Sequence, residues 1–473
     1  MIEFKNVSFT YEGTGEGKIK NLNFTIQTGE CVVLTGRSGC GKTTVTRVIN
    51  GLIPEFFSGD LTGQVMVNGE DIGEKELYEI AKNTGSVFQN PKTQFFNTDT
   101  DGEIAFGMEN GGVPERKMRE RVKSTAEDLK IEHLLGRSIF SLSGGEKQKI
   151  AFASVYAMNP DIYLLDEPSS NLDIDAIEDL RQHIALLKKQ GKTILIAEHR
   201  LYYLRDLADR IFYLDKGTVR HIWSNHEFAG LSEEKRTKLG LRTPRYVRPS
   251  LKQVIREDSE KEEEGKAFLR IKNLSVGYGK ETVLSNLNFQ AAAGEIIAIT
   301  GHNGAGKSTF CRTLCGLLKP LEGSIFWKGR KCKEKERLKN SYMVMQDVNY
   351  QLFADSVEHE CGFGIQNPDR QKITETMKHL ELYEYKDRHP NTLSGGQKQR
   401  IAVAVSMICR KDILIFDEPT SGLDYESMCT VAELMKQLAG MGKLIFVVTH
   451  DFELMELVCT RELRLSEETE TPL

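Results

Sequence analysis

The sequence contains no long hydrophobic run. No stretch of its 473 residues approaches the ~18 consecutive apolar residues that a transmembrane helix needs. The N-terminus, MIEFKNVSFTYEG, lacks a basic segment followed by an apolar one, so it is not typical of a secretory signal. The net charge of −5 is small for this length and gives no indication of a nucleic-acid-binding surface. These absences disfavour membrane-spanning, secreted and nucleic-acid-binding proteins.

A pairing pattern is also missing among the cysteines. The nine cysteines are spread along the chain, which predicts a reduced, cytoplasmic location. Cys311 and Cys315 are one helical turn apart, and a metal or redox role is one interpretation of them. Small buried side chains explain the pair better.

The same set of motifs is present twice, in the same order. A chain of this length predicts several domains, and two halves of a little over 200 residues fit. The repeated motifs are GRSGCGKT at 36–43 and GHNGAGKS at 301–308, LSGGE at 142–146 and LSGGQ at 393–397, and LLDE at 164–167 and IFDE at 415–418. A duplication of this kind predicts two nucleotide sites built by one polypeptide.

The spacing between the two copies locates an insertion. Gly36 and Gly301 are 265 positions apart, whereas Ser143 and Ser394 are 251 apart, so the first half has 265 − 251 = 14 extra residues between these motifs. Part of the difference lies at 54–64.

The sequence predicts domains at 1–225 and 267–473.

A charged linker is predicted at 226–266, because this stretch has no counterpart in the repeat. It contains TPRYVRP followed by the charge run EDSEKEEEGK, which favours a solvated tether. A basic recognition patch at 242–248 is the alternative.

Short apolar runs alternate with helical patterns in both halves. The runs at 162–165 and 413–416 are continuously apolar, as in strands that are buried on both faces of a parallel sheet. Strands that alternate with helices predict an α/β fold with a parallel core. The regions 94–159 and 351–410 are mostly helical in pattern, which predicts a helical lobe inserted into each core.

Each GxxxxGK[ST] loop follows a strand and opens a helix, the context in which this motif binds phosphate. Glycines let backbone N–H groups turn toward phosphate, and the helix N-terminus adds a favourable dipole. Lys42 and Lys307 can reach the β- and γ-phosphates, and Thr43 and Ser308 can ligate Mg²⁺. The predicted nucleotide-binding residues of the loops are Gly36, Ser38, Gly39, Gly41, Lys42, Thr43, Thr44, Gly301, Asn303, Gly304, Gly306, Lys307, Ser308 and Thr309.

A pair of carboxylates follows a buried strand in each half. Asp166 and Asp417 end apolar runs, so their side chains are predicted to bind Mg²⁺ beside the phosphate loop. Glu167 and Glu418 come next in the chain, so their side chains are expected to point in a different direction from those of the aspartates. They are predicted to act as bases toward the attacking water.

The glycine signatures LSGGE and LSGGQ lie 23 residues before the catalytic aspartate in each half (143 to 166, and 394 to 417). With the other motifs, they make the chain resemble the ATP-binding cassette (ABC) ATPases over nearly its whole length outside the linker. The resemblance implies two tandem P-loop domains, each with a parallel-sheet core, an antiparallel β subdomain and a helical subdomain. It also implies ATP and Mg²⁺ as cofactors.

The resemblance also implies roles for residues outside these motifs. Gln89 and Gln346 match the glutamines that contact Mg²⁺ and water, and Tyr11 and Tyr278 lie where the family stacks an aromatic ring on adenine. His199 and His450 match the histidine that contacts the γ-phosphate. The two halves are expected to pair head to tail within one chain. In that arrangement Ser143, Gly144 and Gly145 face the nucleotide held by Lys307, and Ser394, Gly395 and Gly396 face the one held by Lys42.

The stretch after each glutamine indicates which branch of the family the chain resembles. QNPKTQFF at 89–96 and QDVNYQLF at 346–353 resemble the ATPases of energy-coupling factor (ECF) importers. The resemblance implies a groove for a coupling helix of the integral membrane T subunit. Phe95, Phe96, Leu352 and Phe353 are expected partly in the core and partly in this groove. The second copy departs from the pattern, with Asp347-Val348 in place of Asn-Pro.

An ECF-type ATPase would lie on the cytoplasmic face of the cell membrane, with a T-type subunit and a substrate-binding membrane subunit as partners. It would energise uptake of a vitamin, a vitamin precursor or a transition-metal ion. Two alternatives stay open: a fused sugar-importer ATPase, and a twin-cassette ATPase that acts on ribosomes.

Overall fold

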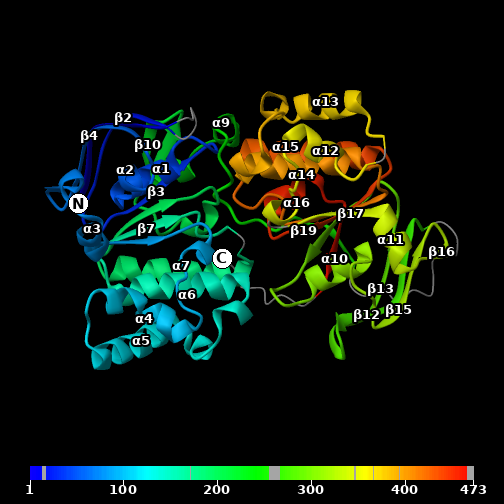
Figure 1. Cartoon of the computed structure of the whole chain (residues 1–473), viewed down its shortest axis with the longest axis horizontal. Helices are drawn as coiled ribbons and strands as arrows, with labels where there is room; N and C mark the ends of the chain where they lie inside the picture. The colour runs from blue at the N-terminus through cyan, green and yellow to red at the C-terminus, as the bar shows by residue number, and fades with distance from the viewer. Residues whose placement is uncertain are drawn as a thin grey trace. The chain divides into compact units, whose positions relative to one another are not determined.

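The computed structural model of the chain describes residues 1–12, 18–170, 172–254, 267–345, 348–365, 367–393 and 395–465. The chain divides into two compact units, with the division between Tyr246 and Val247. Both units contain a largely parallel six-stranded sheet and a four-stranded antiparallel sheet (Figure 1). This is the α/β architecture that the repeated motifs predict. None of the helices in the described parts is long and apolar enough to cross a membrane.

The first unit contains ten strands and nine α-helices among the described residues. Its strands are β1 (Ile2–Tyr11), β2 (Ile19–Ile26), β3 (Cys31–Gly36), β4 (Gly59–Val67), β5 (Glu70–Asp71), β6 (Thr84–Val87), β7 (Ile162–Asp166), β8 (Thr193–Ala197), β9 (Arg210–Asp215) and β10 (Thr218–Ser224). Its helices are α1 (Lys42–Ile49), α2 (Leu52–Glu55), α3 (Leu77–Asn83), α4 (Thr100–Asn110), α5 (Glu115–Leu129), α6 (Gly144–Met158), α7 (Ile174–Lys189), α8 (Asn225–Ala229) and α9 (Glu233–Lys238).

The six-stranded sheet of this unit has the order β10-β9-β3-β8-β7-β6, and all its pairs are parallel except β9 with β10. Every residue of β7 and β8 is buried, because both faces of the sheet are covered. The second sheet has the order β2-β1-β4-β5. Helices α4 and α5, light blue to cyan in Figure 1, and the blue-green α6 form the predicted helical lobe.

The second unit repeats this plan. Its strands are β11 (Lys252–Val254), β12 (Leu269–Tyr278), β13 (Glu281–Ala291), β14 (Ile296–Thr300), β15 (Glu322–Trp327), β16 (Arg330–Lys331), β17 (Ser341–Val344), β18 (Ile413–Asp417), β19 (Leu444–Val448) and β20 (Arg461–Arg464). Its helices are α10 (Lys307–Cys315), α11 (Glu334–Asn340), α12 (Val357–Gly362), α13 (Arg370–His379), α14 (Gly395–Ile408), α15 (Tyr425–Gly440) and α16 (Phe452–Val458).

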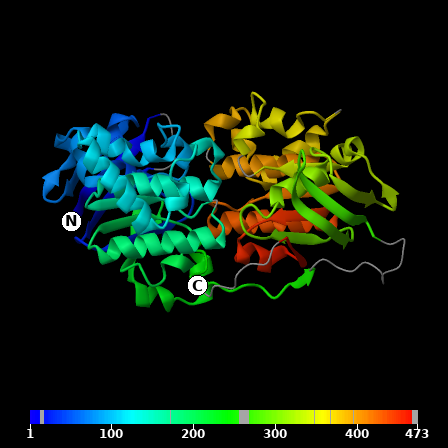
Figure 2. The same ribbon diagram turned by 90° about the horizontal axis from the view of Figure 1, so that it is seen from below.

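Its sheets have the orders β11-β20-β14-β19-β18-β17 and β13-β12-β15-β16. Figure 2 shows the second sheet in lighter green beside the orange and red core of the unit. Helix α10 buries Cys311 and Cys315 in this core, which confirms their interpretation as small buried side chains.

The first part of the predicted linker is packed rather than solvated. Helices α8 and α9 begin near residue 225, and Phe228 and Leu241 are buried in the core of the first unit. Apolar residues in a polar stretch thus extend this unit beyond the limit that the repeat predicts. Further along, β11 pairs in parallel with β20. The charge run at 257–266 lies outside the described residues, so its role as a tether stays a prediction.

Two of the three arginines in the alternative basic patch at 242–248 are engaged within the protein, whereas Arg245 is exposed. Arg242 is buried, and the guanidinium of Arg248 donates to the carboxylate of Glu462 at 2.7 Å. Neither side chain presents a free positive charge to a partner.

Candidate nucleotide-binding sites

The first phosphate loop connects β3 to α1. Gly36 lies so close to the next strand that a Cβ atom would be 2.1 Å from the carbonyl oxygen of Leu214, and its φ of 148° favours glycine. Gly41, at φ 106°, precedes the first residue of α1. The loop therefore needs glycine at these positions, and α1 directs its N-terminal N–H groups to the place where phosphates would bind.

Lys42 begins α1 and is buried at the centre of this loop. Its ammonium donates to the carbonyl oxygens of Gly36 and Arg37 at 3.2 Å. It also lies 3.0 Å from Nε2 of His199, which follows β8. The predicted phosphate-binding lysine and γ-phosphate histidine therefore meet at one point.

The carboxylates at the end of β7 face the same point. The hydroxyl of Thr43 donates to Oδ1 of Asp166 at 3.1 Å. The amide of Gln89 donates to Oε2 of Glu167 at 2.5 Å, and Oε1 of Glu167 lies 3.6 Å from Nε2 of His199. Four separate segments of the first unit thus bring together the residues that the sequence predicts for ATP hydrolysis.

Both predicted catalytic glutamates have a left-handed backbone. Glu167 has a φ of 45° and Glu418 a φ of 49°, a region that costs free energy for a residue with a side chain. The N–H of Glu167 donates to Ala197 O at 2.8 Å, and that of Glu418 to Val448 O at 2.9 Å. This geometry turns each glutamate away from the direction of the preceding aspartate, as expected if the two carboxylates have different tasks.

Burial changes the protonation of the first site. It raises the pKa of Glu167 from 4.5 to about 8, although the nearby charge of Lys42 opposes the shift. Burial also raises the pKa of Asp166, and it lowers the pKa of His199 together with the charge of Lys42. A carboxyl group whose pKa lies near physiological pH suits proton transfer from water.

The second site repeats the arrangement where the structure describes it. Lys307 donates to Gly301 O at 2.5 Å and to His302 O at 3.1 Å. Nε2 of His450 lies 3.8 Å from Oε1 of Glu418. Burial raises the pKa of Asp417, while the positive charge of Lys307 and a hydrogen bond from Ser308 act in the opposite direction. Gln346 lies outside the described residues.

The residues of the first site fit Mg²⁺. The Thr43 hydroxyl and the Asp166 carboxylate are adjacent oxygen donors, the kind that this hard cation prefers. The described part of the chain contains no group of three or more His, Cys, Asp or Glu residues that could hold a metal ion alone. We therefore expect the phosphates of the nucleotide to complete the coordination of the ion.

The two tyrosines expected to stack on adenine have different surroundings. The hydroxyl of Tyr11 lies 3.2 Å from Oγ1 of Thr44 and accepts from Arg47 at 3.2 Å, and its ring makes edge contacts with Phe9 and Phe57. Tyr278 is 49% exposed and accepts only from Arg312, at 3.3 Å, among the described residues. Both tyrosines thus contact the helix that follows a phosphate loop, Tyr11 at Thr44 and Arg47 of α1 and Tyr278 at Arg312 of α10.

The glycine signatures begin long helices. Ser143 precedes α6 and accepts from the N–H of Glu146 at 3.2 Å, while Gly144 and Gly145 form its first turn. Gly395 and Gly396 begin α14 in the same way, and Ser394 lies outside the described residues. The expectation that each signature completes the site of the other half stays a prediction.

Two residues that were not among the predicted site residues hold the stretch after Gln89 in place. Gln94 Oε1 accepts from Phe88 N at 3.3 Å, and its amide donates to Ser86 O at 3.3 Å. Glu103, only 2% exposed, accepts from Phe96 N at 3.0 Å and from Asn97 N at 2.8 Å. Side chains thus provide the hydrogen bonds that this irregular backbone lacks.

The second half repeats both anchors. Gln351 accepts from Met345 N at 2.9 Å and donates to Met343 O at 2.7 Å. Glu360 accepts from Phe353 N at 2.7 Å and from Ala354 N at 2.6 Å. The signal for these residues is in the sequence, because Gln94 to Gln351 and Glu103 to Glu360 are both 257 positions apart.

Replacing Glu103 by Gln should loosen the stretch after Gln89. A neutral amide accepts more weakly than a carboxylate, and each such bond contributes about 1.5–3 kcal/mol when one partner is charged. We expect the amides of Phe96 and Asn97 to exchange hydrogen roughly 10- to 100-fold faster, as measured by hydrogen–deuterium exchange. Glu109→Gln on α4 is the control, and equal protection in both variants would contradict the anchoring role.

A comparison with known families identifies the fold and its chemistry. The sequence pattern of the family described as ABC transporter matches residues 19–170 and 284–421. The chain belongs to the ABC transporter family. It contains two fused ABC cassettes, and it is an ATPase that binds ATP.

Relatives of similar length carry the same family name. A Treponema denticola protein with the provisional name ABC transporter ATP-binding protein is 49% identical over 98% of this chain and 95% of its own length. A Bacillus subtilis protein, provisionally named HMP/thiamine import ATP-binding protein YkoD, is 32% identical over 96% of this chain and 88% of its own. ABC ATP-binding proteins of this kind typically pair with membrane subunits.

Solved structures share the fold over nearly the whole chain. A ribosome-bound archaeal Pelota and ABCE1 structure has a TM-score of 0.69 at 24% identity, covering 97% of this chain and 76% of that one. The RNase-L inhibitor has a TM-score of 0.64 at 23% identity, and the match covers 97% of this chain and 87% of that one. At these identities the likeness concerns the twin-cassette fold alone.

Proposed function

We propose that this chain is the ATP-hydrolysing subunit of an ECF-type importer. It would act at the cytoplasmic face of the cell membrane with an integral T-type subunit and a substrate-binding membrane subunit, and would energise uptake of a vitamin, a vitamin precursor or a transition-metal ion. The observation that supports this proposal is an exposed phenylalanine in the stretch that follows the predicted catalytic glutamine of each cassette. These residues are Phe96, after Gln89, and Phe353, after Gln346. The B. subtilis relative, whose name refers to import, agrees with it.

Neighbouring apolar residues of this segment have opposite environments. Phe95 packs against the core, whereas Phe96 is 74% exposed and stacks on Phe106 at 4.7 Å. In the second cassette Leu352 is 5% exposed and Phe353 is 70% exposed. The expected mixture of core and surface side chains is therefore present in both cassettes. Exposed aromatic residues are typical anchors of a protein interface.

The same segment leads back to the ATPase centre. In the first cassette, Gln94 bonds to the backbone of Ser86 and Phe88, directly before Gln89, and Gln89 bonds to Glu167. A helix that docks on Phe96 can therefore shift the backbone that carries Gln89. The proposed consequence is that docking adjusts the water and Mg²⁺ positions, so that hydrolysis responds to the membrane partner.

Within this proposal the two cassettes close their nucleotides head to tail. Ser143, Gly144 and Gly145 would act on the nucleotide at Lys307, and Ser394, Gly395 and Gly396 on the one at Lys42. The N-termini of α6 and α14 provide N–H donors suited to the γ-phosphate. Fusion of the cassettes would raise the effective concentration of each for the other.

The experiment is to replace Phe96 and Phe353 together by Ser in a strain that expresses the natural membrane partners. We expect the double variant to fold and bind ATP but to lose co-purification with integral membrane subunits, because a few aromatic anchors carry most of the energy of such a groove. Uptake of the transported compound should fall in parallel.

Tyr78→Ser with Met441→Ser is the matched control, since these side chains are exposed to a similar degree elsewhere, at 63% each. Thermal unfolding of both variants checks the fold. A folded Phe96/Phe353 variant that keeps its partners and its transport would show that this surface is not the interface. Co-purification of the wild-type chain with ribosomes instead of membrane subunits would favour the ribosomal alternative.

A further inference from the structure

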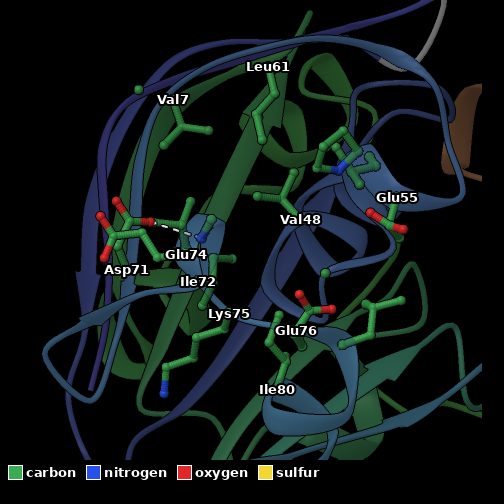
Figure 3. Close-up of a pocket in the computed structure, with 17 residues that line it drawn as sticks. Val7, Val48, Glu55, Leu61, Asp71, Ile72, Glu74, Lys75, Glu76 and Ile80 are labelled. Atoms are coloured by element: carbon green, nitrogen blue, oxygen red, sulfur yellow. Dashed lines mark hydrogen bonds between the residues drawn. The ribbon is translucent and has the colours of Figure 1, made fainter.

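A cavity of about 370 Å³ lies in the first cassette, away from the ATPase residues. Its apolar wall includes Val48 and Ile80, from α1 and α3, and Val7 and Leu61, from β1 and β4 (Figure 3). Glu55 lies in the segment 54–64, which accounts for part of the extra length of the first half. The insertion therefore supplies part of a hollow that the repeat does not require.

The rim of this cavity is acidic. Figure 3 shows Glu55 on one side, Asp71 and Glu74 on the other, and Glu76 below. The one lysine of the lining, Lys75, is already ion-paired with Glu70. Four carboxylates with a single compensated cation create a negative potential, which attracts a positively charged group.

The second cassette shows what fills the same space there. Asn83 and Asn340 end the matching helices α3 and α11, so Ile80 corresponds to Arg337. By the same matching of α1 with α10 and of β5 with β16, Val48 corresponds to Thr313 and Ile72 to Cys332.

The guanidinium of Arg337 bridges these elements. It donates to Thr313 O at 3.1 Å and to Cys332 O at 3.0 Å. A cavity of only about 10 Å³, room for roughly one water, remains beside Arg337 and Cys332. The second cassette thus uses a buried cation on an aliphatic stem to join these three elements.

The first cassette keeps this plan but lacks the cation. Ile80 takes the place of the arginine, and Val48, Ile72 and Ile80 all line the open cavity. A carbonyl oxygen has two lone pairs, and Val48 O and Ile72 O each accept one backbone bond, from Gly51 N and Lys75 N. An incoming donor could therefore use the second lone pair of each oxygen.

We propose that this cavity binds a small molecule that carries a guanidinium or ammonium group on a short aliphatic stem. The stem contacts Val7, Val48 and Leu61. The cationic head takes the position that a guanidinium has in the other cassette, beside the carboxylates of Glu55 and Glu74. This site is separate from the nucleotide and from the proposed membrane-docking surface, so it does not depend on the proposed function.

The test is calorimetric titration of the full chain with n-propylguanidinium, and with n-propylurea as the uncharged analogue. We expect a dissociation constant of roughly 0.1–1 mM for the cation, the range of a small fragment, and binding at least about tenfold weaker for the urea. Glu55→Gln with Glu74→Gln should weaken the cation about fivefold or more. Glu115→Gln with Glu132→Gln makes the same change of charge elsewhere in this cassette and should have no effect.

Ile80→Arg is the sharpest variant, because it introduces the residue that the second cassette has. It should abolish binding of n-propylguanidinium and leave ATP binding intact. If Ile80→Arg does not fold, Leu61→Trp serves as the test variant instead, because it fills the cavity from the opposite wall. The proposal is overturned if no saturable binding occurs, if the urea binds as tightly, or if a cavity-filling variant still binds the cation. Binding of an arginine-containing peptide but not of n-propylguanidinium would assign the cavity to a protein partner and would overturn it too.

Discussion

Glu167→Gln with Glu418→Gln is expected to leave ATP bound but almost unhydrolysed. Each glutamate follows the aspartate at the end of a buried strand, and Glu167 contacts Gln89 and lies 3.6 Å from His199. Glutamine keeps the shape of the side chain and can still accept the hydrogen bond from Gln89, but it cannot take a proton from water. The loss of a general base typically slows a reaction by ~10²–10⁴-fold.

Single-turnover hydrolysis with excess protein measures this effect, and equilibrium binding of ATP shows whether the sites stay intact. Each single variant should slow one of two kinetic phases, because Lys42 and Lys307 are predicted to hold separate nucleotides. Glu115→Gln on the surface of α5 is the control. Normal single-turnover rates in the double variant would reject the assignment of the bases.

The stability of the first cassette without nucleotide should depend on pH through Glu167. Its pKa rises from 4.5 in the unfolded chain to about 8 in the folded one, mainly because of burial. A raised carboxyl pKa means that the folded state holds the proton more tightly. The corresponding stability is fully present below about pH 4.5 and is lost as the pH rises through about 8.

Glu167→Gln removes this titration. We therefore expect the free energy of unfolding of the wild type, relative to the variant, to fall by about 3 kcal/mol between pH 5 and pH 8, since one pKa unit corresponds to about 1.4 kcal/mol. Urea titrations of the nucleotide-free chain at several pH values measure it. Glu115→Gln gives the background from loss of an exposed carboxylate. A constant difference between wild type and Glu167→Gln would show that Glu167 is ionised in both states.

Residue types and their spacing were enough to predict the architecture and the composition of the sites. Phosphate loops and Asp-Glu pairs require particular residues at fixed intervals, so they can be identified from the order of amino acids alone. Apolar runs such as 162–165 and 413–416 predicted strands buried on both faces, and β7 and β18 are fully buried. These features depend on local chemistry and on short-range pattern, and each of them is present twice because of the duplication.

Which of two neighbouring side chains lies inside depends instead on tertiary packing. Phe95 and Phe96 have the same chemistry, yet one packs on the core and the other is exposed, because the carboxylate of Glu103 fixes the direction of the backbone between them and α4. The packing of 225–241 on the first unit, where Phe228 and Leu241 are buried, likewise depends on surfaces far away in the sequence.

The cavity of the first cassette is the clearest example of a feature that depends on tertiary packing. Nothing in the local sequence marks Ile80 as special. The role of Ile80 can be recognised only because three elements meet around it in the folded chain. At the matching position of the other cassette, Arg337 donates hydrogen bonds to the carbonyl oxygens of Thr313 and Cys332. Sequence pattern determines which residues an element contains, but the space that is left between elements depends on how side chains from distant segments fill it.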